Sequence, residues 1–232
     1  MKKITLALSI ALTACSHLPD NEQLITTLTK VNPHESLICQ YQKSLDKQKP
    51  ETASNWYLWR NPNRIETYDD FSNQGEIWEK NSAGQISYTR LFYNEKVALD
   101  FTAGDLSAIG ASQDWNTLGS LIDTKNFGKE LKLLDSHDNN IQQYSGISNG
   151  AATEVDWLPA LQLPSSVTKK LSSGTVVITL KKCGNTTKSL QYFPSNTDIK
   201  NFRHLDFTDL GDMEDDPLVQ KIVQVIGHQH SH

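Results

Sequence analysis

The chain has 232 residues, with 27 acidic and 22 basic side chains and a formal net charge of −5. This length fits one domain with a sizeable hydrophobic core. A mildly acidic chain without a run of five like charges argues against a nucleic-acid partner and against an electrostatic attachment to anionic lipid.

The first fourteen residues have the three parts of an export signal. Lys2 and Lys3 form the basic start, residues 4–12 are apolar, and small residues precede Cys15. The apolar run is shorter than the roughly 20 residues that a membrane-spanning helix needs. We therefore predict a signal peptide over residues 1–14. An ordinary secretory signal, with Cys15 merely near its cleavage site, is the alternative.

The ending Leu12-Thr13-Ala14-Cys15 resembles the lipobox of bacterial lipoproteins. The resemblance implies that the Cys15 thiol is lipidated, that the chain is cut before it, and that the new amino group is acylated, with palmitate as an expected acyl group. Ser16, where inner-membrane lipoproteins have Asp, implies routing to the outer membrane. Two or three acyl chains hold a protein stably at a bilayer. We expect an outer-membrane lipoprotein that faces the periplasm, with residues 15–34 as anchor and tether.

Two cysteines remain once Cys15 is assigned to the lipid. Cys39 and Cys183 form an even pair in an oxidising compartment, which predicts a disulfide bond. Two buried free thiols are the alternative, because sequence spacing alone does not show that the two positions meet.

From residue 35 onward, short runs of alternating polarity predict β-strands. Turns rich in Asn, Gly and Pro join the first six into an antiparallel meander. These six cover residues 36–46, 55–60, 64–69, 75–80, 85–93 and 96–101.

Beyond the meander, the apolar period lengthens to three and four residues, which predicts a helical insert over residues 104–127. A turn with a helical piece is expected over residues 158–174, and a final amphipathic helix over residues 216–226. Five further strands are predicted at residues 129–135, 141–148, 153–158, 175–183 and 202–207.

The eleven predicted strands and few helices make a mainly β, α+β fold. Antiparallel strands in this number close as a barrel or curl into a half-open one, with short helices covering the mouth. Because the sequence contains no internal repeat, we predict one domain over residues 35–227, followed by a histidine-rich tail over residues 228–232.

Two strand motifs resemble the lipoprotein carrier superfamily of the LolA and LolB type. One is the strand pair that carries Trp59, Pro62 and Arg64, and the other is the strand Gly75-Glu76-Ile77-Trp78-Glu79 before a turn. With the lipobox and a strand-rich body of this size, the resemblance covers residues 36–210. It implies an incomplete barrel whose concave face binds acyl chains.

Aromatic residues are the candidates for the wall of an apolar cavity. The interior of an eleven-stranded sheet is too wide for side chains to fill easily, which favours a cavity or a plugging helix. The same residues could instead fill an ordinary core. The candidate cavity residues are Trp56, Trp59, Trp78, Phe92 and Phe101, and Tyr57, Trp115 and Trp157 could line the same cavity.

Histidines alternate in the last five residues, at His228, His230 and His232. Imidazoles with this spacing can chelate Cu(II), Ni(II) or Zn(II). A terminus that binds nothing in the cell is the alternative, because a free tail lacks the second shell that orients metal ligands.

No common catalytic motif is present in the sequence. It lacks a Gly-x-Ser-x-Gly elbow, a P-loop, a His-Glu-x-x-His pair and a Cys-x-x-Cys pair, so we do not expect an enzyme. The leading hypothesis is a membrane-anchored protein that binds a lipid, an acyl chain or another lipoprotein. The alternatives are a structural or assembly lipoprotein that binds an envelope protein, and a copper- or zinc-binding envelope protein that uses its histidine tail.

Overall fold

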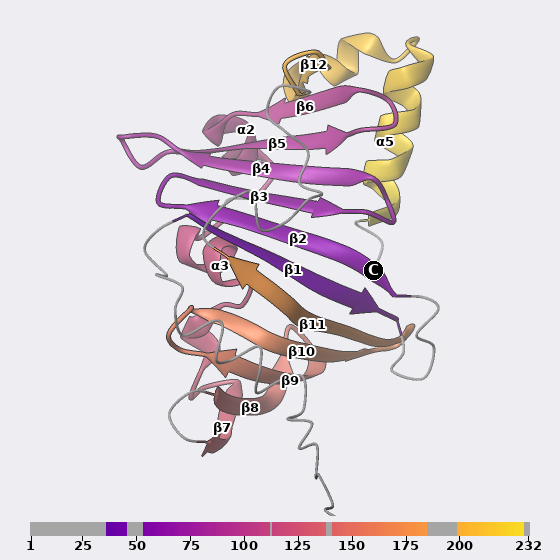
Figure 1. The fold of residues 1–232 in the computed structure, drawn as a ribbon. Helices are drawn as coiled ribbons and strands as arrows, with labels where there is room; N and C mark the ends of the chain where they lie inside the picture. The colour runs from indigo at the N-terminus through magenta and orange to yellow at the C-terminus, as the bar shows by residue number, and fades with distance from the viewer. Residues whose placement is uncertain (1–35, 46–52, 112, 138–140, 185–198, 230–232) are drawn as a thin grey trace, which may run out of the picture.

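A computed structural model describes residues 36–45, 53–111, 113–137, 141–184 and 199–229 of the chain. Within these residues, twelve strands form one open sheet (Figure 1) in the order β12-β6-β5-β4-β3-β2-β1-β11-β10-β9-β8-β7. The mainly β, half-open barrel predicted from the sequence is therefore confirmed. The predicted signal peptide, Cys15 and the tether lie outside the described residues.

The sheet has two halves that meet at the N-terminal strand, β1 (Leu37–Ser44). The first half contains β2 (Ser54–Asn61), β3 (Arg64–Asp69), β4 (Gln74–Lys80), β5 (Ile86–Phe92), β6 (Val97–Phe101) and β12 (Arg203–Asp206). The second half contains β7 (Leu131–His137), β8 (Ile141–Ser148), β9 (Ala151–Leu158), β10 (Leu163–Leu171) and β11 (Gly174–Gly184).

Neighbouring strands pair antiparallel, with one exception. The last strand, β12, runs parallel to β6, with Arg203 opposite Val97 and Asp206 opposite Asp100. A parallel neighbour requires a long crossover connection, and the chain supplies one because β12 comes more than 100 residues after β6. The prediction of a wholly antiparallel sheet is wrong for this edge strand.

The predicted helical insert is confirmed. It contains α2 (Ala103–Ala108), α3 (Trp115–Ser120) and the short 3-10 helix η2 (Thr124–Asn126). In Figure 1, α2 and α3 lie behind the sheet and cover one of its faces. We call this helix-covered side the inner face.

Two helices follow the last strand. They are the 3-10 helix η4 (Phe207–Met213) and α5 (Pro217–Gln229). The predicted final helix is thus confirmed, and its backbone continues through His228 and Gln229, the first two residues of the predicted tail. None of the described helices is long and apolar enough to cross a membrane.

The strand β10 was missed by the sequence analysis, which assigned a turn and a helical piece to residues 158–174. The pairing of β10 with β9 shifts register between Pro164 and Ser166. A bulge of this kind interrupts strict alternation, and proline is tolerated in a sheet at such a position. The alternating pattern was therefore broken at the residues where the strand begins.

A disulfide bond joins Cys39 to Cys183, as predicted. The two residues lie opposite each other in the β1–β11 pairing, with their Cα atoms 4.1 Å apart. Because β1 pairs with β2 on its other side, the bond fastens the two halves of the sheet at their junction.

The main hydrophobic core lies on the inner face. Leu37, Cys39 and Tyr41 of β1 are fully buried there, and α2 contributes Leu106 while α5 contributes Val219 and Ile222. A separate cluster serves the second half of the sheet and contains Leu131, Val155, Trp157 and Val167, with Ile122, Phe127 and Tyr144 packed against it.

We expect loss of the disulfide to destabilise the fold strongly. Cys39 and Cys183 are 144 residues apart, and a bond that closes so long a loop restricts the unfolded chain by about 3 to 5 kcal/mol. The double variant Cys39→Ala/Cys183→Ala should therefore unfold at a much lower urea concentration than the oxidised protein. A reductant should lower the midpoint of the wild type and leave that of the double variant unchanged. Equal midpoints for all samples would contradict the prediction.

Candidate functional site

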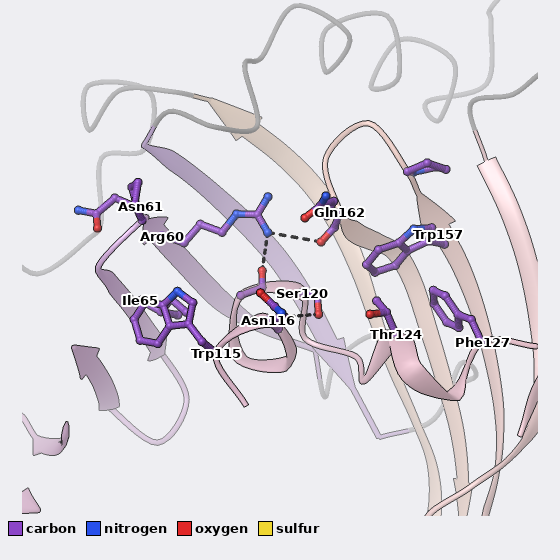
Figure 2. Close-up of a pocket in the computed structure, with 13 residues that line it drawn as sticks. Arg60, Asn61, Ile65, Trp115, Asn116, Ser120, Thr124, Phe127, Trp157 and Gln162 are labelled. Carbon is purple, nitrogen blue, oxygen red and sulfur yellow. Dashed lines mark hydrogen bonds between the residues drawn. The ribbon is translucent and has the colours of Figure 1, made fainter. Parts of the chain in front are cut away.

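A cavity of about 730 Å³ lies on the inner face, where α3 faces the β2–β3 turn and the β9–β10 turn (Figure 2). Aromatic, aliphatic and uncharged polar groups make up most of its wall. The lining residues are Arg60, Asn61, Pro62, Ile65, Trp115, Asn116, Gly119, Ser120, Thr124, Phe127, Trp157, Pro159 and Gln162.

The short helix α3 is fixed at both ends. The Asp114 carboxylate accepts hydrogen bonds from the backbone N–H groups of Asn116 and Thr117, at 3.0 and 3.1 Å, which caps the start of the helix. The Ser120 hydroxyl contacts the carbonyl oxygens of Asn116 and Ile122 at 2.7 and 2.6 Å at the other end. These contacts give the cavity a defined wall although the helix has only six residues.

A side chain from η2 strengthens the cap of α3. The Lys125 ammonium lies 2.9 Å from the second carboxylate oxygen of Asp114. Its hydrogen bond is the main cause that lowers the pKa of Asp114, and the bond from the Thr117 amide adds to it. The capping carboxylate is therefore ionised at neutral pH.

Aromatic rings form the apolar part of the wall. Phe127 stacks on Tyr144 with 4.0 Å between ring centroids and meets Trp157 edge to face at 5.2 Å. On the opposite side of the cavity (Figure 2), Trp115 lies under the Lys80 ammonium, 4.7 Å from the ring centroid. The cavity thus has aromatic surface on two sides.

Arg60 projects into the cavity from the end of β2, and Figure 2 shows its guanidinium between α3 and the β9–β10 turn. Its Nη1 donates hydrogen bonds to the carbonyl oxygens of Gly119 and, at 3.4 Å, Gln162, and its Nη2 donates to the carbonyl oxygen of Leu161. Burial lowers the pKa of Arg60. One side chain therefore joins β2, α3 and the β9–β10 turn.

A buried tyrosine of β1 forms a hydrogen bond next to the same region. The Tyr41 hydroxyl donates a hydrogen bond of 3.0 Å to the carbonyl oxygen of Pro164, which ties β1 to β10 across the intervening strand β11. Burial raises the pKa of Tyr41 far above its ordinary value. The phenol is therefore neutral and acts as a donor.

Several polar side chains of the wall are available to a ligand. The side chains of Asn116, Thr124 and Gln162 make no hydrogen bond with any described residue. A cavity of this size, with aromatic surface and a few polar groups, has the composition of small-molecule sites in proteins. It could hold the apolar part of an amphiphile together with a polar head.

The five aromatic residues predicted for the cavity wall lie elsewhere on the sheet. Trp56, Trp78, Phe92 and Phe101 belong to the inner-face core or pack against it, and Trp59 alternates with Leu58 toward the outer face. Trp56 borders a small hollow of about 160 Å³, and Phe101 borders an open hollow of about 940 Å³ near α2. A ligand role for these five residues stays a prediction.

Of the residues that line the cavity, only Trp115 and Trp157 were among the aromatic residues expected there from the sequence. For Arg60 a signal existed, because it occupies the same alternating positions of β2 as Trp56 and Leu58, which face the core. A charged residue in such a position indicates a special contact. No comparable signal marked Phe127 or Gln162, whose turns approach the cavity only through the tertiary structure.

The predicted metal site lies at the edge of the described chain. The backbone of His228 belongs to α5, whereas His230 and His232 lie outside the described residues. Within the described part, no group of three or more histidine, cysteine or acidic side chains is placed to hold a metal ion. Copper or zinc binding by the tail stays a prediction.

Comparison with known proteins gives no family assignment, because no protein-family model and no curated protein matches the chain. Among solved structures, PNGF-II has a TM-score of 0.41 at 12% identity, over 77% of this chain and 33% of its own. MucB has a TM-score of 0.38 at 11% identity, over 78% of this chain and 62% of its own.

The lipoprotein LppX of Mycobacterium tuberculosis has a TM-score of 0.34 at 10% identity, over 72% of this chain and 94% of its own. The chain thus spans about a third of the length of PNGF-II and almost all of the length of LppX.

The cap of α3 provides a test of the cavity wall. In Asp114→Ala the first amides of α3 lose their acceptor, so we expect faster hydrogen exchange over residues 115–120 and a lower melting temperature. Asp114→Asn, which keeps an acceptor for these amides but loses the charge opposite Lys125, should stay close to the wild type. Because the pKa of Asp114 is lowered in the folded state, the difference between Asp114→Ala and wild type should be full at neutral pH and should shrink to that between Asp114→Ala and Asp114→Asn as acid protonates the carboxylate. Identical exchange in wild type and Asp114→Ala at neutral pH would contradict the role of this cap.

Proposed function

We propose that this protein is a lipid-anchored envelope protein that binds an amphiphile, such as the acyl chain of a lipid or of another lipoprotein, in the cavity beside α3. The observation that carries the proposal is the cavity itself. Its volume of about 730 Å³ falls in the range of about 300 to 1,000 Å³ that is usual for sites that bury a small ligand.

The width of the sheet explains why such a cavity persists. A curled sheet of twelve strands encloses more space than its own side chains fill. The insert that carries α2 and α3 occupies part of this space. Aromatic side chains such as Phe127 and Trp157 then line the remainder, where an apolar chain would gain free energy by leaving water.

The polar groups of the cavity support binding as the proposed role, rather than catalysis. Its described lining contains no Asp, Glu, His, Cys or Lys, so no base stands beside a candidate nucleophile. The hydroxyl of Ser120 is 5% exposed and is bonded to backbone carbonyl oxygens. Nucleophilic catalysis requires a base within hydrogen-bonding reach of such a hydroxyl.

The proposed location agrees with the chemistry of the fold. A disulfide between Cys39 and Cys183 is typical of proteins that fold in an oxidising compartment such as the periplasm. Lipidation of Cys15 would then hold the domain beside the outer membrane on its periplasmic side. A carrier of acyl chains would exchange its ligand with that membrane.

A second candidate function is the binding of a protein partner at the free edge of the sheet. The edge strand β7 carries Leu133 and Leu134, and its neighbour β8 carries Ile147, and all three side chains are more than half exposed. Leu134 lies at a register shift in the β7–β8 pairing and has no opposite residue on β8. An exposed edge strand with apolar side chains can pair with an extended segment of another chain.

Filling the cavity should weaken the binding of an acyl chain. Thr124→Trp places a large ring at a lining position that is exposed at the surface, so the variant should fold normally. We expect at least about tenfold weaker binding of a fluorescent fatty acid, measured by titration. Thr124→Val keeps the volume of the side chain and should bind like the wild type. Equal affinity in both variants would remove the cavity as the binding site, and the absence of any bound or co-purified lipid in native mass spectrometry of the wild type would remove the proposed function.

The second candidate is tested by cross-linking in cells. A photo-reactive residue at Leu134 should capture one stoichiometric envelope protein. The same residue at Leu171, which is also exposed but lies at the β10–β11 turn, should capture none. Without a specific product at Leu134, this candidate would be abandoned.

A further inference from the structure

Arg60 is the only charged residue among the thirteen described residues that line the cavity. Its three hydrogen-bond acceptors are all neutral backbone carbonyl oxygens, those of Gly119, Leu161 and Gln162. No carboxylate of the described chain forms an ion pair with it. Within the described part of the chain, the guanidinium charge is therefore compensated only by the dipoles of backbone carbonyl groups.

Two of the other three arginines of the protein pair with carboxylates. Arg64, the first residue of β3, pairs with the carboxylates of Glu66 and Glu79. Arg203 pairs with Asp216 at 2.7 Å. These side chains lie near the surface, where water also screens their charge. The most deeply placed of Arg60, Arg64 and Arg203 is Arg60, and it is the one without an anionic partner in the described chain.

The geometry of the guanidinium leaves donors available. Of the five N–H groups of an arginine, those on Nη1 and one on Nη2 account for the three bonds to carbonyl oxygens. No described residue accepts a hydrogen bond from Nε. The Nε–H group and an Nη2–H group form one of the edges through which arginine binds a carboxylate or phosphate with two parallel hydrogen bonds.

A partly buried cation without a counter-charge loses hydration, and this desolvation lowers the pKa of Arg60. An anion that enters the cavity would offset it, because hydrogen bonds between ionised groups are stronger than those to neutral carbonyl oxygens. The aromatic rings of Phe127 and Trp157 line the same cavity (Figure 2) and can bury an attached apolar chain.

We propose that Arg60 binds the anionic head group of an amphiphile, a carboxylate or a phosphate, whose apolar chain lies against Phe127 and Trp157. The inference rests on the proposed function and specifies the chemical class of its ligand. The side chains of Asn116 and Gln162 border the same space and would donate hydrogen bonds to the oxygen atoms of the head group.

The test compares twelve-carbon ligands that differ only in the head group. Dodecanoate and dodecyl phosphate carry the anion, methyl dodecanoate carries the same chain without charge, and inorganic phosphate carries the charge without the chain. Isothermal titration of the wild-type protein should give at least about tenfold tighter binding for the two anionic amphiphiles than for the ester. Inorganic phosphate should bind much more weakly than dodecyl phosphate.

Two variants assign the preference to Arg60. Arg60→Gln removes the charge but keeps a donor for a backbone carbonyl oxygen, so we expect it to bind the acid and the ester with equal affinity. Arg60→Lys keeps the charge and should retain a preference for the acid. Since the head-group comparison is made on the wild type, the test remains decisive if Arg60→Gln fails to fold.

The outcomes separate this inference from the proposed function. Equal wild-type affinity for acid and ester would overturn the inference and leave acyl-chain binding in place. An acid preference that persists in Arg60→Gln would also overturn it. Binding of inorganic phosphate as tightly as dodecyl phosphate would assign the site to a free anion and overturn it. Failure of all the amphiphiles to bind would overturn both.

Discussion

The structure depends on the insertion of one strand, β1, between two meanders that are distant in the sequence. β1 pairs with β2, its neighbour along the chain, and with β11, which lies about 140 residues later. Without this second pairing, the two halves of the sheet would be separate. The Cys39–Cys183 bond crosses the same junction, and the Tyr41 hydroxyl reaches over β11 to the carbonyl oxygen of Pro164. The β1–β11 pairing, the disulfide bond and the Tyr41 hydrogen bond therefore all stabilise this junction. Its formation brings together two distant parts of the chain, which costs much chain entropy.

The candidate site is a product of the same junction. Arg60 comes from the first half of the sheet, Trp157 and Gln162 come from the second half, and Trp115 comes from the insert between them. The strand, turn or helix that carries each of these residues could form without the cavity. Only the pairing of β1 with β11 brings them to one place. The hydrogen bonds from Arg60 to the carbonyl oxygens of α3 and of the β9–β10 turn then fix their relative positions.

The sequence predicted the elements well where hydrophobic periodicity and turn residues agree. The first six strands, the helical insert and the final helix follow from alternation and capping, and the disulfide follows from cysteine number and compartment. The bulge at Pro164 concealed β10 because it breaks alternation. Most of the cavity wall could not be predicted from the sequence, for another reason. A tryptophan such as Trp78, which stacks on Tyr88 in the core, has the same local pattern as one that lines a cavity. Which of them is left partly uncovered depends on long-range packing.

The position of the cavity follows from the way the core is divided. The main hydrophobic cluster serves β1, the first half of the sheet and parts of β9, β10 and β11, and a smaller cluster serves β7, β9 and β10. The insert contacts both, since Leu118 packs against the first cluster and Phe127 against the second. The helix α3 of this insert has only six residues and ends before Leu121, which is in a left-handed conformation, and space remains beside it. The space that remains is bordered by aromatic rings from the insert and the second half, and by the guanidinium of Arg60 from the first. The same division that leaves a gap in the core therefore also gives that gap an apolar wall and a charged one, which is the arrangement that an amphiphile requires.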